Sequence, residues 1–570
     1  MQYDLIIKNG TVIDGSGMPR FRSDVGIVDG KIASIGRIRD GAQETIDAEG
    51  HVVTPGFIDG HTHMDAQVSW DPLGTCSCWH GITSVVMGNC GFSLAPCKES
   101  EKDMVMRNLE RAEDIAPEAM NAGIKWTWET FPEYLDSVER LPKGINYAAY
   151  MGHSALRTHV MGERAFTDPA TEQDLEQMKQ AVREAIQAGA IGFTTSRTRN
   201  HQTPQRQPVA SRLATWDEVR QLVGAMGEMG AGIFEIAGED TGQNPERIRE
   251  YMDRLKALAV DTGVPVTYGM FSMRRAPDCW QPYLDLTDET AAAGGRMFLQ
   301  VHSRALNAVL SFQTNTPFDR LPSWRALKKM KSLEEKEAAL RDPDYRRKLV
   351  EEAHTQEDDG NRGVGPEARA ANFKWLFLMD QPNPPHRSIE EIATERNQDP
   401  VETFIDLALE KNLKQFFLQP LANENQEHVL EMMRHPRSVI TFSDSGAHVS
   451  QIMDSSLQTH LLSHWVREQQ AITLEDAVRQ LTFVPASQWG LHGRGLLREG
   501  MTADVVVFNP ETVGPMMPEL TYDLPAGARR LKQKAAGFLA SVVNGQVVLR
   551  ENEHTGALPG QLLRGPLAQR

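Results

Sequence analysis

Short apolar runs alternate with helical stretches through the middle of the chain. The helical stretches include 172–188 and 216–227. This alternation is typical of parallel strands joined by helical crossovers. It predicts an α/β protein whose residues 52–489 form a (β/α)₈ TIM barrel, in which reacting groups lie at the C-terminal ends of the strands. The expected strands are 52–58, 83–87, 146–150, 190–194, 232–236, 264–268, 297–301 and 439–442.

Both ends of the chain show a different pattern of short strands and tight turns. Near the start, strand-like runs are separated by one Asn-Gly and two Asp-Gly pairs, which are strong hairpin signals. Near the end, 503–508 and 540–548 are further strand candidates. We therefore expect residues 1–51 and 490–570 to form one small β-domain together.

A long segment interrupts the barrel pattern before its last strand. Residues 305–396 contain a charged helical stretch over 327–340 and the polar run Asp358-Asp359-Gly360-Asn361-Arg362-Gly363. An insertion at this place predicts a lid over the active-site face. A surface helical excursion with no catalytic part is the alternative.

Composition excludes some partners and leaves the reaction open. The 570 residues carry 60 basic and 77 acidic side chains, a net charge of −17, which argues against nucleic acid and anionic membranes as partners. Five cysteines in so long a chain are too few for a disulfide framework, and an odd number cannot all pair with one another. The sequence starts without a signal-peptide pattern and has no apolar run of about 18 residues. These features predict a cytoplasmic protein and leave a homo-oligomer open.

Two histidines follow directly on the first expected barrel strand, in Pro55-Gly56-Phe57-Ile58-Asp59-Gly60-His61-Thr62-His63. At a spacing of two on an extended backbone, the side chains of His61 and His63 point to the same side. Two converging neutral imidazoles can chelate a borderline divalent ion such as zinc. The alternative is a pair of surface histidines in a turn, but the apolar strand before them favours a metal site.

Two further candidate ligands follow other expected strands. Cys90 comes after the second strand and can bind zinc as a thiolate, or pack as a small buried side chain. Asp444 comes after the last strand, where a carboxylate can contact a metal and accept a proton from water. The alternative for Asp444 is a helix cap.

These motifs resemble those of the amidohydrolase superfamily. Asp59-Gly60-His61-Thr62-His63-Met64-Asp65, followed by Gly88-Asn89-Cys90-Gly91, is similar to the N-acyl-D-amino-acid deacylase (D-aminoacylase) family. The resemblance implies that the small β-domain is a β-sandwich. It also implies a small-molecule substrate, an N-acyl-D-amino acid or related small amide, whose C–N bond is cleaved by metal-activated water. By the same resemblance, Cys90 takes the bridging place that a carboxylated lysine holds in other amidohydrolases, and Asp444 is the catalytic acid/base.

The sequence departs from the family at two positions. Dinuclear members carry a histidine after strand five and another after strand six, where Glu235 and Tyr268 stand here. The loss of these imidazoles favours one zinc ion and leaves a second open, with Glu235 as a further oxygen ligand or acid/base group. The predicted ligands of the one ion are His61, His63, Cys90 and Asp444.

Polar residues after several strands are candidates for substrate binding. An arginine that faces the pocket would suit the carboxylate of an N-acyl amino acid through a bidentate pair, although each arginine can equally form a structural ion pair. The candidates are His153, Arg157, Arg197, Tyr268, Arg304 and His448.

Other functions fit the same residues. A cyclic amide, lactone or ester hydrolase would need the same metal site. A non-catalytic binding member is the more distant alternative, and the presence of His61, His63 and Asp444 together argues against it.

Overall fold

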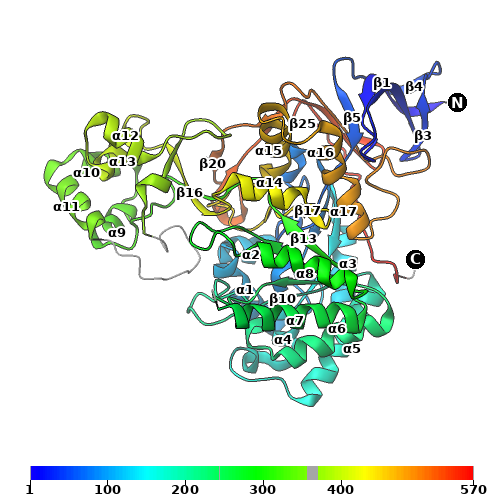
Figure 1. Cartoon of the computed structure of the whole chain (residues 1–570), viewed down its shortest axis with the longest axis horizontal. Helices are drawn as coiled ribbons and strands as arrows, with labels where there is room; N and C mark the ends of the chain where they lie inside the picture. The colour runs from blue at the N-terminus through cyan, green and yellow to red at the C-terminus, as the bar shows by residue number, and fades with distance from the viewer. Residues whose placement is uncertain (1, 243, 356–369, 569–570) are drawn as a thin grey trace.

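Parallel strands followed by helices form the centre of the molecule (Figure 1). The computed structural model describes residues 2–242, 244–355 and 370–568. One parallel sheet pairs β6 (Phe57–Asp59), β7 (Ile82–Met87) and β8 (Asn146–Ala149). A second pairs β9 (Met151–Gly152), β10 (Gly192–Ser196), β11 (Ile233–Ala237), β12 (Val266–Met270), β13 (Met297–Val301) and β17 (Ser438–Ile440).

The first and last of these strands end side by side. Only Tyr150 separates β8 from β9, so the two sheets run on as one parallel series. Just beyond β6 and β17, a parallel bridge joins Thr62 to Ser445, and the His63 N–H donates to the Ser445 carbonyl at 2.8 Å. Residues that follow β6 and β17 are therefore brought to one place.

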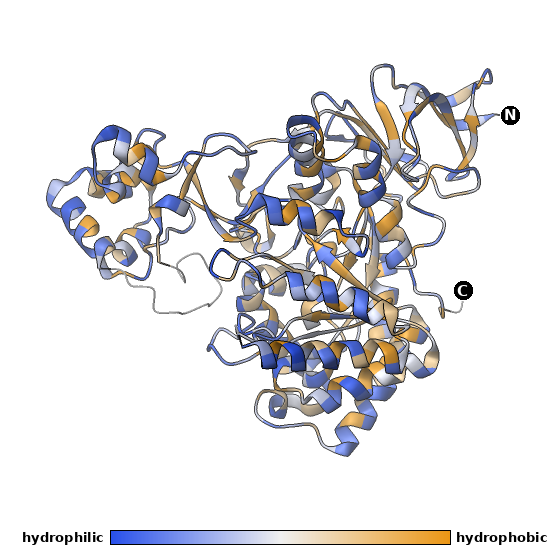
Figure 2. Cartoon of the chain, in the orientation of Figure 1, coloured by the Kyte–Doolittle hydropathy of each residue, from blue (hydrophilic) through white to orange (hydrophobic). Residues whose placement is uncertain are grey.

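Most helices of the central body lie between these strands in sequence, and α15, α16 and α17 follow the last strand. The hydrophilic and hydrophobic segments that alternate along the helices in Figure 2 reflect one solvent face and one packed face. Threonine caps begin four of them, since each cap accepts the backbone N–H three residues later; the caps are Thr130, Thr171, Thr215 and Thr473. None of the described helices is both long and apolar enough to cross a lipid bilayer. The helices are α1 (Lys102–Ala112), α2 (Pro117–Gly123), α3 (Phe131–Arg140), α4 (His153–Met161), α5 (Glu172–Ala188), α6 (Trp216–Met229), α7 (Pro245–Thr262), α8 (Gln281–Ala292), α14 (Gln426–Arg434), α15 (Leu457–His460), α16 (Leu474–Leu481) and α17 (Phe483–Gln488).

Strands from both ends of the chain form one nine-stranded sheet, seen at the upper right of Figure 1. Its strands are β1 (Tyr3–Val12), β2 (Phe21–Val28), β3 (Lys31–Gly36), β4 (Ala42–Asp47), β5 (Val52–Pro55), β18 (Val505–Phe508), β23 (Phe538–Val543), β24 (Gln546–Arg550) and β25 (Glu553–His554). Side chains from both ends, such as Ile7 and Val542, share one hydrophobic core. The sandwich form and the boundaries of this domain stay predictions.

One expected strand is wrong. Residues 52–58 form two strands, because β5 pairs with β1 and β18 of the terminal sheet while β6 pairs with β7. Gly56 lies at the break, where its N–H donates to the Asp504 carbonyl at 2.9 Å. A Cβ at Gly56 would lie 2.1 Å from Thr83 Oγ1, so only glycine fits. The run is apolar throughout, and hydropathy alone cannot show that it divides. The other expected strands agree with the structure within two residues at each end.

The segment after β13 forms a body to one side, at the left of Figure 1. Aromatic side chains such as Phe318, Trp324 and Phe404 give it a core of its own. Its sheet reaches Ala422, past the expected end of the insertion at 396. The Asp358–Gly363 run lies outside the described residues, and the lid over 305–396 stays a prediction. Its elements are β14 (Leu306–Leu310), α9 (Pro322–Lys328), α10 (Leu333–Arg341), α11 (Pro343–His354), β15 (Phe377–Met379), α12 (Ile389–Arg396), α13 (Pro400–Leu409) and β16 (Phe416–Ala422).

Candidate metal centre

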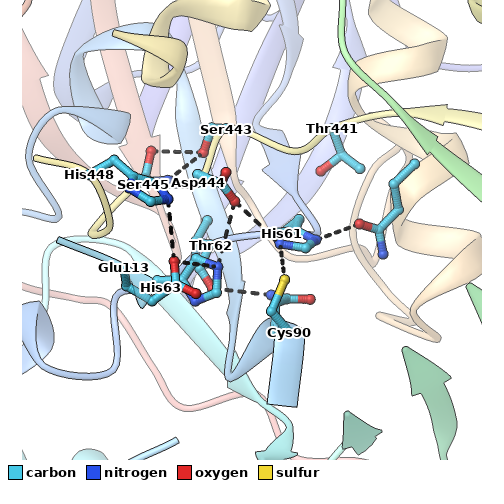
Figure 3. A network of polar contacts seen from close by, with 12 residues as sticks. His61, Thr62, His63, Cys90, Glu113, Thr441, Ser443, Asp444, Ser445 and His448 are labelled. Carbon is cyan, nitrogen blue, oxygen red and sulfur yellow. Dashed lines mark hydrogen bonds and ion pairs between the residues drawn. The ribbon is translucent and has the colours of Figure 1, made fainter. Parts of the chain in front are cut away.

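Four of the predicted ligands meet where the first, second and last parallel strands end (Figure 3). His61 Nε2 lies 3.4 Å from Cys90 Sγ and 3.3 Å from Asp444 Oδ1. His63 Nε2 lies 3.5 Å from the same Asp444 oxygen. Donor atoms bound to one zinc ion at about 2.0–2.3 Å lie roughly 3.4 Å from one another. The donor atoms of His61, His63 and Cys90 all lie within 4.8 Å of one another, so these three side chains can hold a single ion, with Asp444 beside the two histidines.

The neighbours of His61 fix which ring nitrogen faces the ligands. Gln300 Nε2 donates to Thr267 Oγ1 at 3.2 Å, which leaves Gln300 Oε1 to accept from His61 Nδ1 at 2.5 Å. A proton on Nδ1 means that His61 Nε2 presents a lone pair toward Cys90 and Asp444. Gln300 thus prepares His61 to bind a metal.

The loops that carry the ligands have strained backbones. Cys90 has a φ of 55° and Asp444 a φ of 50°, in the left-handed region that side chains other than glycine rarely adopt. Gly446, with a φ of 95°, lets the loop after β17 pass close to β6, since a Cβ there would lie 2.4 Å from the His63 carbonyl oxygen. Strain that persists at several residues of one site is typical of functional sites.

Burial and close charges perturb the ionisation of the group. Burial acts to raise the pKa of Asp444, but hydrogen bonds and charges from His61 and His63 hold that pKa well below its usual value. Burial raises the pKa of Cys90 well above its usual value, and the charge of Glu235 raises it further. A cation at this place would favour the thiolate form of Cys90.

Glu235 lies against the cluster on β11. Its Oε2 accepts the Cys90 backbone N–H at 2.7 Å. Burial raises its pKa to about 7, and the charge of His61 partly opposes that rise. Its Oε1 has no hydrogen-bond partner among the described residues, so it is free to bind a cation or a proton.

The structure separates three predicted substrate residues from the metal ligands. Arg157 is fully buried and its guanidinium pairs with Glu218, donating to Oε1 at 2.6 Å. His153 Nε2 lies 2.8 Å from the same Oε1. Tyr268 points toward α8, where its hydroxyl donates to the Tyr283 carbonyl at 3.4 Å. The structure therefore does not bring these side chains to the cluster.

Two predicted arginines are held by carboxylates. Arg197 Nη2 lies 3.0 Å from Glu239 Oε1. Arg304 is buried, donates from Nη1 to Ser456 Oγ at 2.7 Å, and lies with Nε 3.7 Å from Asp454 Oδ1. Neither guanidinium is left without polar partners.

Sequence reasoning missed a carboxylate in the cluster. Glu113 Oε2 lies 3.5 Å from His63 Nε2 and 3.6 Å from Nε2 of the predicted residue His448, as Figure 3 shows. Its Oε1 lies 3.8 Å from His201 Nε2. Glu113 follows α1 in an ordinary helical sequence that gives no signal of a site. His201 was also missed, although its position after the fourth predicted strand could have indicated a site residue.

The fold and the ligand set together define a protein class. The sequence model described as "Amidohydrolase family" matches residues 44–549. The chain belongs to this family, as its motifs predicted.

Individual relatives cover nearly the whole chain. D-aminoacylase of Alcaligenes xylosoxydans xylosoxydans is 28% identical over 564 residues, 98% of this chain and 97% of the relative. The structure of N-acyl-D-glutamate deacylase from Bordetella bronchiseptica, complexed with zinc and a phosphonate inhibitor, matches with a TM-score of 0.67 at 24% identity, covering 99% of this chain and 100% of that one. A D-aminoacylase with a binuclear metal centre and one-metal activation matches with a TM-score of 0.66, the same identity and the same coverage. These likenesses confirm the α/β amidohydrolase fold and the predicted resemblance to D-aminoacylases.

Proposed function

We propose that this protein is a metal-dependent hydrolase that cleaves the amide C–N bond of N-acyl-D-amino acids or related small amides. The buried group of His61, His63 and Cys90, whose donor atoms lie close enough together to hold one metal ion, carries this proposal, with Asp444 in contact with both histidines. The names of the full-length relatives, D-aminoacylase and N-acyl-D-glutamate deacylase, support the substrate class.

Zinc is the proposed metal, with one ion at this group. Two imidazoles, a thiolate and a carboxylate are a typical zinc donor set. Both Cys90 Sγ and Asp444 Oδ1 lie near His61 Nε2, which supports a shared ion between them.

The same side chains supply the proton transfers of amide hydrolysis. A bound metal ion would polarise the substrate carbonyl and lower the pKa of a water molecule. Asp444 starts as a carboxylate, accepts a proton from the attacking water and returns it to the leaving nitrogen. Gln300 holds His61, and Glu235 holds the backbone of Cys90.

The proposal includes the surrounding architecture. We take the parallel series as a closed (β/α)₈ barrel that begins at β6, with the two ends of the chain, β5 included, as its small β-sandwich domain and the insertion, extended to Ala422, as a lid. The separate hydrophobic cores of the terminal sheet and of the insertion support this division.

Among the predicted substrate residues, His448 has the best support, since His448 and the predicted ligand His63 contact the same carboxylate oxygen of Glu113.

A substrate panel tests the function. Zinc-loaded protein is incubated with N-acetyl-D-methionine, N-acetyl-D-glutamate, their L enantiomers, a hydantoin and a lactone, and free amine or ring opening is measured. We expect amine release from at least one D substrate, at least tenfold faster than from its L enantiomer, in wild type and in the exposed-site control His354→Ala. Opening of the hydantoin or lactone alone would assign a different bond, and no turnover of any substrate would favour a binding protein.

A further inference from the structure

A second group of buried polar side chains lies close to the metal ligands. We call it the Arg304 group, and its members, each at most 4% exposed, are His302, Arg304, Asp454 and His460. Two members follow β13 and two follow β17, at the end of the parallel strands where the metal ligands lie. Burial raises the pKa of Asp454, Arg304 opposes that rise, and the charge of Asp444 adds to it. The group is therefore close enough to Asp444 to sense its charge.

The polar atoms of the Arg304 group do not satisfy one another. Asp454 Oδ1 lies 3.7 Å from both His302 Nε2 and Arg304 Nε, beyond the usual length of a hydrogen bond. Asp454 Oδ2, His302 Nε2 and His460 Nε2 have no hydrogen-bond partner among the described residues. Each buried polar atom without a partner costs about 1–3 kcal/mol. Several such atoms at one place, next to a predicted active site, indicate that a polar part of the substrate binds there.

Neighbouring contacts show which members donate and which accept. Arg304 can only donate, and the carboxylate of Asp454 can only accept. Asn383 Nδ2 donates to Ser463 Oγ at 2.8 Å, so Asn383 Oδ1 accepts from His460 Nδ1 at 3.1 Å. His460 Nε2 is then an acceptor as well, and burial together with the charge of Arg304 holds the pKa of His460 well below its usual value. The group thus combines a strong donor with two acceptors.

We propose that the Arg304 group binds the side chain of the substrate amino acid and selects a carboxamide, as in an N-acyl-D-glutamine or N-acyl-D-asparagine. The carboxamide oxygen would accept from Arg304, and its NH₂ group would donate to Asp454. A side-chain carboxylate would have to share a proton with Asp454, and an apolar side chain would leave the buried group unpaired. The inference rests on the proposed function, which brings the amino acid to the neighbouring metal centre.

Three substrates of nearly equal size test this selection. N-acetyl-D-glutamine, N-acetyl-D-glutamate and N-acetyl-D-methionine are compared by kcat/KM on zinc-loaded wild type. We expect the value for glutamine to exceed the other two at least tenfold, because a site built to hydrogen-bond a substrate strongly rejects analogues that lack the matching group.

Asp454→Asn tests the acceptor directly. Asparagine has the size of aspartate but can donate to a substrate carboxylate, so the ratio of kcat/KM for glutamine to that for glutamate should fall at least tenfold. The exposed control Asp253→Asn on α7 should keep the wild-type ratio. Arg304→Lys keeps the charge but loses the planar fork, and should lower the ratio of glutamine to methionine at least tenfold.

The outcomes separate this inference from the proposed function. A wild type that prefers glutamate or methionine, or an unchanged ratio in Asp454→Asn, would overturn the carboxamide selection and leave the proposed hydrolase intact. Hydrolysis of none of the three substrates by wild type would contradict both. Circular dichroism checks that each variant is folded, and if Asp454→Asn is not, the ratio in Arg304→Lys decides.

Discussion

The buried side chains of the centre make fewer hydrogen bonds than their polarity demands. Among the described residues, Glu235 Oε1 and Glu113 Oε1 have no hydrogen-bond partner. Each such oxygen costs about 1–3 kcal/mol when it is buried without compensation. Bound cations and substrate would provide that compensation, so the folded chain is expected to hold metal tightly.

Asp444→Asn tests the acid/base assignment. The amide keeps the size of the side chain but cannot accept a proton, so kcat for the best amide substrate should fall by about 100- to 10,000-fold at saturating zinc. The exposed control Asp253→Asn on α7 should keep wild-type kcat. A fall of less than tenfold, with metal content unchanged by elemental analysis, would assign the proton transfers to another group.

Sequence reasoning reached the ligands that follow strands and missed those that do not. His61, His63, Cys90 and Asp444 each follow an apolar run, and a barrel brings such positions together. Glu113 reaches the same point from the end of α1, through tertiary packing that no local pattern records. On β12, both faces are apolar or weakly polar, so the sequence could not show that Tyr268 turns toward α8 while Thr267 turns toward Gln300.

At the scale of elements, the turn at Gly56 connects the terminal sheet to the parallel strands. β5 belongs to the first and β6 to the second, and the two histidines follow β6 directly. The position of His61 and His63 therefore depends on a sharp change of direction within an apolar run. Most other strands could be predicted, because single buried strands between helices give isolated apolar runs.

Gly56→Ala tests this junction. The new Cβ would lie 2.1 Å from Thr83 Oγ1, so we expect a loss of unfolding free energy of about 1–3 kcal/mol or more. Gly36→Ala is the matched control, since no atom lies within 4 Å of its Cβ position. Urea unfolding of both variants gives the comparison, and equal midpoints would show that the junction tolerates a side chain.

At the scale of the whole molecule, buried polar contacts join the central body to the C-terminal segment. His80 Nε2 lies 3.1 Å from the Gln533 carbonyl and His80 Nδ1 lies 2.8 Å from Thr459 Oγ1. Asn146 donates to Asp504 Oδ2 at 3.1 Å, which links β8 to the residue before β18. Such contacts between distant segments could not be predicted from local sequence patterns.

The pH dependence of stability tests the contact of His80. Burial lowers the pKa of His80 to about 3, below its unfolded value of about 6.5. The unfolded state therefore binds more protons between these values, and stability is lost as pH falls from about 6.5 toward 3. At pH 5 the protonation of His80 in the unfolded state should have lowered the free energy of unfolding by about 2 kcal/mol.

The comparison uses urea unfolding midpoints of metal-free protein at pH 7 and pH 5. Wild type should lose more stability than His80→Gln over this interval, because glutamine does not titrate there. An equal loss in the two proteins would mean that His80 is protonated in the folded state.

Reversible metal removal tests the central claim most directly. Wild type is stripped with a chelator, assayed with the best N-acyl-D-amino acid, and titrated with zinc, beside Cys90→Ala treated in the same way. We predict that hydrolysis falls below about a tenth without metal, returns with about one equivalent of zinc in wild type, and needs at least roughly tenfold more zinc in Cys90→Ala. Full hydrolysis by protein that elemental analysis shows to be free of metal would contradict the account.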